Sequence, residues 1–105
     1  MKKRLNFFLI VIIFNISFLP LKADTTFDLG KKIFLGNGNC ATCHTLADAK
    51  SNGQIGPNLN QIRPDMARVL NAVNNGIGVM PAYEGILTSD EINAVAEYVY
   101  LTSSQ

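Results

Sequence analysis

Both cysteines and the only histidine of this 105-residue chain lie within five residues, Cys40-Ala41-Thr42-Cys43-His44. The spacing C-x-x-C-H is the attachment signal of a c-type haem. Its two thiols form thioethers with the vinyl groups of the porphyrin, and the adjacent histidine is an axial ligand of the iron. The sequence therefore predicts one haem c, covalently attached through Cys40 and Cys43, with His44 as its proximal ligand.

Three other uses of this cluster are less favoured. A structural zinc site needs four protein ligands, usually in two spaced pairs, and the chain has only three cysteine and histidine residues, all in one cluster. A thioredoxin-type dithiol normally follows a strand in a βαβ pattern, and no such pattern is visible. A disulfide between Cys40 and Cys43 would close too short a loop to add much stability.

A methionine is predicted to fill the sixth position of the iron, because the chain has no second histidine. Met1 belongs to a segment that we expect to be removed. Met66 falls on the apolar face of a predicted helix, which favours a role in core packing. Met80 lies in a Gly-Val-Met-Pro loop, where Pro81 restricts the backbone. We therefore predict that Met80 is the second axial ligand, which raises the reduction potential and opposes a ligand-binding or peroxidatic function.

The segments at the two ends of the mature chain, which must help to position these ligands, are predicted to be helices. Residues 26–35 repeat apolar side chains at helical spacing and end at a Gly-Asn-Gly breaker. The last helix begins with a capping box formed by Thr88 and Glu91. Its apolar face is predicted to run from Ile92 to Leu101. The fold class is therefore all-α.

A middle helix is predicted to begin with Pro64 at its first position and to end at Gly76. Residues 45–63 and 76–83 are assigned to loops, because glycine and proline interrupt any helical pattern there. No strand is predicted. The apolar Val79-Met80 pair in the second loop needs a partner that buries it.

Residues 1–23 have the layout of a signal peptide, with a basic head and a short apolar stretch that ends near Ala23. We expect cleavage there, a mature domain over residues 24–105, and a soluble protein in the periplasm. A membrane contact is expected only if the segment stays uncleaved. Cleavage removes four of the nine basic residues and none of the eight carboxylates, which leaves a net charge of −3. No basic run remains that would indicate nucleic-acid binding.

The order of motifs along the chain resembles the class I monohaem cytochromes c, especially their short bacterial and cytochrome c6-like members. The motifs are C-A-T-C-H, then G-P-N-L at residues 56–59, G-V-M-P-A-Y at residues 78–83 and the final L-T-S-D-E-I helix start. The resemblance implies three to five helices around one covalently bound haem. It also implies that the first and last helices cross at Gly30, with Phe34 and Tyr98 packed around the crossing.

The same resemblance implies roles for residues around the haem. The carbonyl of Pro57 would accept a hydrogen bond from His44, and Leu59 would pack on the porphyrin. Arg63 is either a partner of a haem propionate or a solvated surface charge. Tyr83 would line the haem edge near Met80 or simply cover the loop.

The function implied is electron transfer by iron that cycles between Fe(II) and Fe(III), without enzymatic activity. The redox partners expected are a dehydrogenase, a terminal oxidase or another cytochrome. A weaker resemblance, carried by T-L-A-D-A-K-S-N-G-Q-I-G-P-N-L and M-P-A-Y, is to the small cytochromes that serve periplasmic sulfite dehydrogenases. It leaves open that the chain is a dedicated haem c subunit of such an enzyme.

Overall fold

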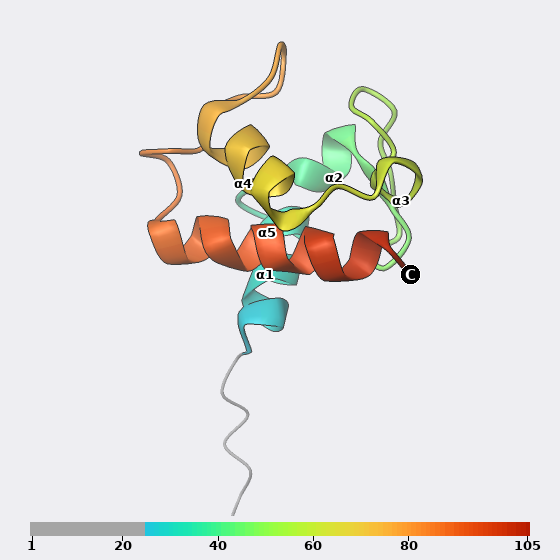
Figure 1. The fold of residues 1–105 in the computed structure, drawn as a ribbon, viewed down its shortest axis with the longest axis horizontal. Coiled ribbons are helices and arrows are strands. Elements are labelled where there is room, and N and C mark those ends of the chain that lie inside the picture. The colour runs from blue at the N-terminus through green and yellow to red at the C-terminus, as the bar shows by residue number, and fades with distance from the viewer. Residues whose placement is uncertain (1–24) are drawn as a thin grey trace, which may run out of the picture.

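The computed structural model describes residues 25–105, so the predicted signal peptide lies outside the described residues. These residues form the helices α1 (Thr26–Leu35), α2 (Cys40–Cys43), α3 (Leu59–Ile62), α4 (Met66–Asn75) and α5 (Ser89–Ser103), with a small hairpin of β1 (Thr45–Leu46) and β2 (Ser51–Asn52). Figure 1 shows the long α5 lying across α1, with α4 on the side of α5 away from the chain start. Within this range no helix has the length and hydropathy that a membrane span requires.

Helix α1 has the bounds that the sequence predicts, and α5 begins at the predicted capping box. Helix α1 is capped by Thr25, whose side chain accepts a hydrogen bond from the backbone N–H of Asp28 at 3.2 Å. The capping box of α5 is complete: Thr88 accepts from the N–H of Glu91 at 3.2 Å, and the Glu91 carboxylate accepts from the N–H of Thr88 at 3.0 Å. One detail is corrected, because Leu101 is 42 % exposed and does not belong to the buried face.

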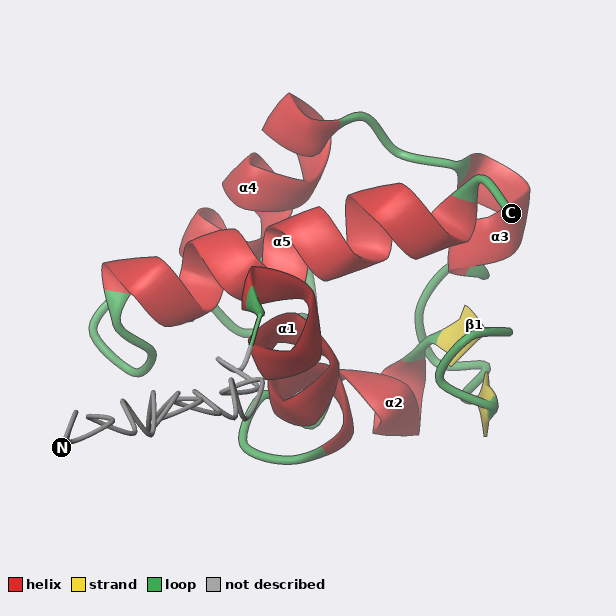
Figure 2. Cartoon of the chain, turned by 90° about the horizontal axis from the view of Figure 1, so that it is seen from below, coloured by secondary structure: helices red, strands yellow, loops and turns green. Residues whose placement is uncertain are grey.

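Helices α1 and α5 cross each other (Figure 2), and their close approach depends on Gly30. A Cβ atom on Gly30 would lie 2.2 Å from the carbonyl oxygen of Ala94 and 2.6 Å from the Cβ of Tyr98. Both distances are far below van der Waals contact, so only glycine permits this approach. The role expected for Gly30 is confirmed.

The middle helix begins later than predicted. Asp65 is its N-cap and accepts a hydrogen bond from the N–H of Arg68 at 2.8 Å, so Pro64 precedes the helix instead of occupying its first turn. The carboxylate of Asp65 accepts from a free backbone N–H of the first turn, whereas proline has no side-chain acceptor for this role. The predicted end is confirmed, since Gly76 follows the last residue of α4 with a φ of 71°.

Residues 45–63, predicted to be a loop, contain short regular elements. Leu46 pairs with Ser51 in the two-residue strands, so the expectation of no strand is wrong for this hairpin. Asn58 caps the single turn of α3 by accepting from the N–H of Gln61 at 3.3 Å. The side chain of Asn60 also accepts from the N–H of Ala47 at 2.8 Å, which holds α3 against β1.

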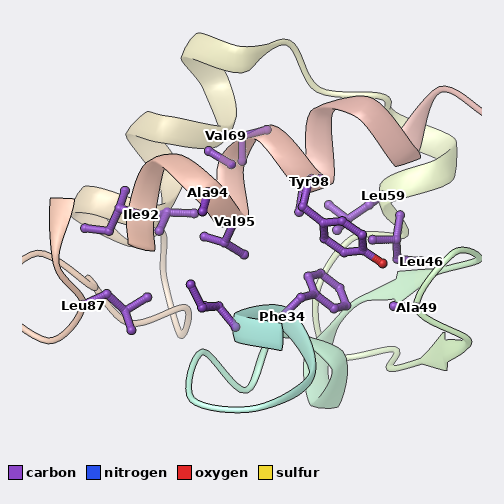
Figure 3. Close-up of a cluster of buried hydrophobic side chains, with 14 residues drawn as sticks. Phe34, Leu46, Ala49, Leu59, Val69, Leu87, Ile92, Ala94, Val95 and Tyr98 are labelled. Atoms are coloured by element: carbon purple, nitrogen blue, oxygen red, sulfur yellow. The ribbon is translucent and has the colours of Figure 1, made fainter. Parts of the chain in front are cut away.

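The buried core lies between α1, α4 and α5 and extends to the hairpin (Figure 3). Tyr98 is fully buried, and its ring packs edge-on against Phe34 at 5.7 Å and Phe27 at 5.1 Å between centroids. Its hydroxyl donates to Asp48 Oδ2 at 2.6 Å, and Lys31 Nζ lies 3.3 Å from the same oxygen. The core therefore joins both terminal helices to the hairpin.

Candidate haem site

Helix α2 places the two cysteines on one face of a single helical turn. The N–H of His44 donates to the carbonyl of Cys40 at 2.9 Å, which closes the turn. Asn39 precedes it in a left-handed conformation, with a φ of 51°, and accepts a hydrogen bond from the Thr42 hydroxyl at 2.6 Å. Side chains three residues apart lie on the same side of a helix. The thiols of Cys40 and Cys43 are therefore presented together, as a double attachment to one porphyrin requires.

The ring of His44 is oriented by the loop that follows the hairpin. His44 leaves the helix with an extended backbone, and its Nδ1 lies 2.7 Å from the carbonyl oxygen of Pro57. Because a carbonyl only accepts hydrogen bonds, Nδ1 carries the proton, and the lone pair of the imidazole is on Nε2. The hydrogen bond implied by the resemblance is thus present, and such a bond raises the donor strength of a ligating histidine.

Two glycines allow the loop to approach the motif this closely. A Cβ atom on Gly56 would lie 2.6 Å from Cε1 of His44, and one on Gly53 would lie 2.5 Å from the carbonyl carbon of Cys43. The N–H of Gly56 donates to the carbonyl of Cys43 at 2.8 Å. The backbone of the loop therefore packs directly against the histidine ring and the motif, and side chains at Gly53 and Gly56 would not fit.

These groups line a cavity of about 270 Å³, just below the roughly 300–1,000 Å³ that is usual for ligand pockets. Its walls are almost entirely apolar and come from every helix. They include Phe34 of α1, Leu59 of α3, Val69 and Val73 of α4, and Val95 and Val99 of α5. Cys40, Cys43, His44 and Met80 line the same cavity. An apolar cavity with two adjacent thiols, an imidazole and a thioether fits a covalently attached haem.

The two candidate methionines are in different surroundings. Met80 lines the cavity together with its neighbours Val79 and Pro81. Met66 does not line it and is instead partly buried against the hydrophobic core. The core-packing role predicted for Met66 agrees with this placement, and Met80 has access to the cavity.

The environment of Cys40 does not favour a reactive thiol. Burial raises its pKa to about 11, and the neighbouring charge of Cys43 adds to the shift, although a backbone hydrogen bond lowers it. Redox-active dithiols instead have a lowered thiol pKa. Within residues 25–105, no three side chains of the histidine, cysteine and acidic types are grouped to hold a metal ion.

Of the two roles left open for Arg63, its position favours the solvated surface charge, because Arg63 does not line the cavity. Arg63 is exposed, and its Nε donates to the carbonyl of Asn60 at 3.3 Å. Arg68 of α4 lines the cavity instead, and the sequence analysis did not identify it. The signal in the sequence is helical spacing, because Arg68 lies four residues before Ala72, which lines the same wall.

Tyr83 and four exposed apolar residues complete the surroundings of the cavity. Tyr83 lines it, and its hydroxyl donates to the carbonyl of Gly38. Ile55, Ile62, Ile77 and Val79 also line it, yet they are 37–87 % exposed. We call these four residues the apolar rim.

Fold and site together define a small helical protein that holds a c-type haem. Residues 25–99 match the family described as "Cytochrome C oxidase, cbb3-type, subunit III". The chain belongs to this cytochrome c family and is a small monohaem cytochrome c with an electron-transfer function. Its cofactor is haem c, attached through Cys40 and Cys43.

Several relatives and one solved structure are similar to the chain. The cytochrome c6 of Leptolyngbya boryana is 36 % identical over 74 residues, which cover 67 % of this chain and 85 % of that protein. The cbb3-type cytochrome c oxidase subunit FixP of Bradyrhizobium sp. (strain ORS 278) is 38 % identical over 82 % of this chain but only 31 % of its own length. The crystal structure of the c-type cytochrome SorU from Sinorhizobium meliloti has a TM-score of 0.71 and 52 % identity, covering 76 % of this chain and 93 % of that one.

Proposed function

We propose that the chain is an exported class I cytochrome c that carries single electrons in the periplasm, with His44 and Met80 as the axial ligands of its haem iron. The observation that carries this proposal is that Cys40, Cys43, His44 and Met80 all line one apolar cavity. When bound, haem c supplies the Fe(II)/Fe(III) couple.

Each of these residues has a separate task in that proposal. The hydrogen bond from Nδ1 to the Pro57 carbonyl leaves the Nε2 lone pair of His44 available, with which His44 would bind the iron. Met80 offers a soft thioether, which favours the ferrous state and raises the reduction potential. The apolar walls exclude water and disfavour the additional charge of the ferric state, so they act in the same direction.

The choice of Met80 is tested by comparing two methionine variants of the holoprotein. Met80→Ala is expected to lower the reduction potential by roughly 100 mV or more, abolish the thioether-to-iron charge-transfer band and let ferric protein bind cyanide rapidly. Met66→Ala is the matched control, and it should lose stability, by about 2 kcal/mol, while the band remains. The assignment would be reversed if Met66→Ala lost the band and Met80→Ala kept it.

The apolar rim is the surface through which a redox partner would approach the haem edge. Interfaces of electron-transfer complexes are small and release quickly, and a rim of four aliphatic side chains matches such a contact. A dehydrogenase, a terminal oxidase or another cytochrome is the partner class we propose. An electron donor and an electron acceptor are both required, because the iron returns to its starting state in each cycle.

A dedicated haem subunit of a periplasmic dehydrogenase, such as a sulfite dehydrogenase, is the second candidate function. The exposure of the rim favours it, since Val79 is 87 % exposed and Ile55 68 % exposed, and permanent partners cover such surfaces. Native purification from periplasmic extract followed by size-exclusion chromatography separates the two candidates. Co-elution with a larger enzyme supports the subunit, whereas a monomer at micromolar concentration supports the free carrier.

A further inference from the structure

The loop that carries Met80 is closed on itself by a reciprocal pair of backbone hydrogen bonds. The N–H of Met80 donates to the carbonyl of Ile77 at 2.9 Å, and the N–H of Ile77 donates to the carbonyl of Met80 at 3.2 Å. Gly78 permits this tight turn with a φ of 56°. The turn fixes the Met80 backbone within the loop, but its tip at Val79 is 87 % exposed and adds little attachment to the rest of the protein.

The two ends of the loop are fixed to α4. At the start, a Cβ atom on Gly76 would lie 2.5 Å from the carbonyl oxygen of Met80, so the loop folds closely over the end of the helix. At the end, the N–H of Tyr83 donates to the carbonyl of Val73 at 2.8 Å. These contacts tie the loop to α4 alone and do not set its distance from α2.

The side chain of Tyr83 makes the connection to the other side of the cavity. Its hydroxyl donates to the carbonyl of Gly38, a residue 45 positions earlier in the chain. Gly38 is buried, and a Cβ atom on it would lie 3.0 Å from the Sγ of Cys40. The acceptor of this hydrogen bond therefore lies directly beside an attachment point of the porphyrin.

We propose that Tyr83 is the positioning residue that holds the Met80 loop closed against the Cys40 side of the cavity. The inference rests on the proposed ligation by Met80. Cys40 fixes one edge of the porphyrin, and the separation between the loop and Gly38 decides whether a thioether on that loop reaches the iron. The hydroxyl of Tyr83 sets this separation, and the phenyl ring forms part of the cavity wall between the two segments.

Replacing the hydroxyl alone tests the proposal, because Tyr83→Phe retains the ring in the cavity wall. The holoprotein is titrated with imidazole in the ferric state, and the rate of carbon monoxide binding is measured in the ferrous state. Both ligands need the sixth position, so both report release of Met80. Losing one neutral hydrogen bond should raise the imidazole affinity and the carbon monoxide rate roughly two- to tenfold. The matched control is Tyr100→Phe, an exposed tyrosine of α5, which should leave both values unchanged.

Two results would overturn the proposal. The first would leave the ligation by Met80 intact, and the second would overturn it as well. If Tyr83→Phe keeps the imidazole affinity and carbon monoxide rate of the wild type while the thioether band is present, Tyr83 supports the fold but does not position Met80. A lower denaturation midpoint alone would not rescue it. If the wild-type protein has no thioether band, the ligation by Met80 fails, and the inference about Tyr83 fails with it.

Discussion

At the scale of single residues, the imidazole of His44 is held by backbone groups and not by other side chains. Pro57 contributes its carbonyl, which accepts from Nδ1 at 2.7 Å, and Gly56 contributes the space beside the ring. A backbone acceptor cannot be protonated or rotated away, so the tautomer that leaves Nε2 free is fixed. The loop shape, more than the identity of its side chains, therefore prepares the ligand.

Arg68 supports a prediction at the same scale. It is the arginine that lines the cavity, and a positive charge near the haem opposes formation of the ferric state. Arg68→Gln is therefore expected to lower the reduction potential by roughly 20–60 mV, with a smaller shift at high salt. A redox titration of the holoprotein measures this. Arg63→Gln is the matched control because Arg63 lies outside the lining, and equal shifts in both variants would contradict the assignment.

The types of residue made most of the cavity predictable, whereas the choice of arginine depended on where α3 and α4 lie in the fold. The C-x-x-C-H spacing and the Met-Pro pair carry their chemistry in the sequence itself, and the structure places Cys40, Cys43, His44 and Met80 at one cavity. Arg63 and Arg68 carry the same side chain, but Arg63 ends α3 and donates back to the carbonyl of Asn60, whereas Arg68 lies in α4 and lines the cavity.

At the scale of elements, the contact between α1 and α5 yields a stability prediction. Alanine is a better helix former than glycine by about 1 kcal/mol, so Gly30→Ala would be stabilising on an open helix surface. Here its Cβ would overlap the Ala94 carbonyl at 2.2 Å, and backbone atoms cannot move aside cheaply. Overpacking of this kind costs about 1–3 kcal/mol or more, so the clash outweighs the propensity.

Urea unfolding of the holoprotein measures the net effect of Gly30→Ala. We expect the free energy of unfolding to fall by roughly 1–2 kcal/mol after the gain in helix propensity is subtracted. Asn93→Ala, at an exposed position of α5, is the control and should change stability by less than about 0.5 kcal/mol. Equal stability of Gly30→Ala and the wild type would mean that the helices can separate at no cost.

Elements of ten or more residues were predictable because periodicity and caps act locally. Helices α1 and α5 carry an apolar face and a side-chain cap within their own sequence. Helices α2 and α3 have four residues each, and the two strands have two residues each. Such elements are too short for a repeat of apolar residues to be detected in the sequence. They are fixed by distant partners, such as the bond from the Ala47 N–H to Asn60.

At the scale of the whole molecule, one polar network joins elements that are distant in sequence. Tyr98 of α5 donates to Asp48 in the hairpin turn at 2.6 Å, and Lys31 of α1 lies 3.3 Å from the same oxygen. The hydrogen bond from Tyr98, opposed by partial burial and assisted by Lys31, holds the pKa of Asp48 below its ordinary value. Burial first, and then the hydrogen bond to Asp48 and its charge, raise the pKa of Tyr98.

These opposite shifts define how the contribution of this network to stability depends on pH. The unfolded chain binds a proton on Asp48 at a higher pH than the folded chain does, so stability is lost as the pH falls below about 4 toward the folded pKa of Asp48. The unfolded chain loses the proton of Tyr98 near pH 10 while the folded chain keeps it, so stability is also lost as the pH rises above about 10. Between these limits the network contributes fully.

Tyr98→Phe is expected to abolish the loss of stability at alkaline pH and to reduce the loss at acid pH. At neutral pH the variant should be less stable by roughly 1.5–3 kcal/mol, the contribution of a hydrogen bond to a charged group. The alkaline loss due to Tyr98 should vanish, whereas the acid loss should only shrink, because Lys31 still lies beside Asp48. Urea unfolding of the holoprotein from pH 3 to 11 measures this, with Tyr100→Phe as the control. Parallel profiles for Tyr98→Phe and the wild type would show that other groups set the pH dependence, since an unlinked tyrosine changes stability equally at every pH.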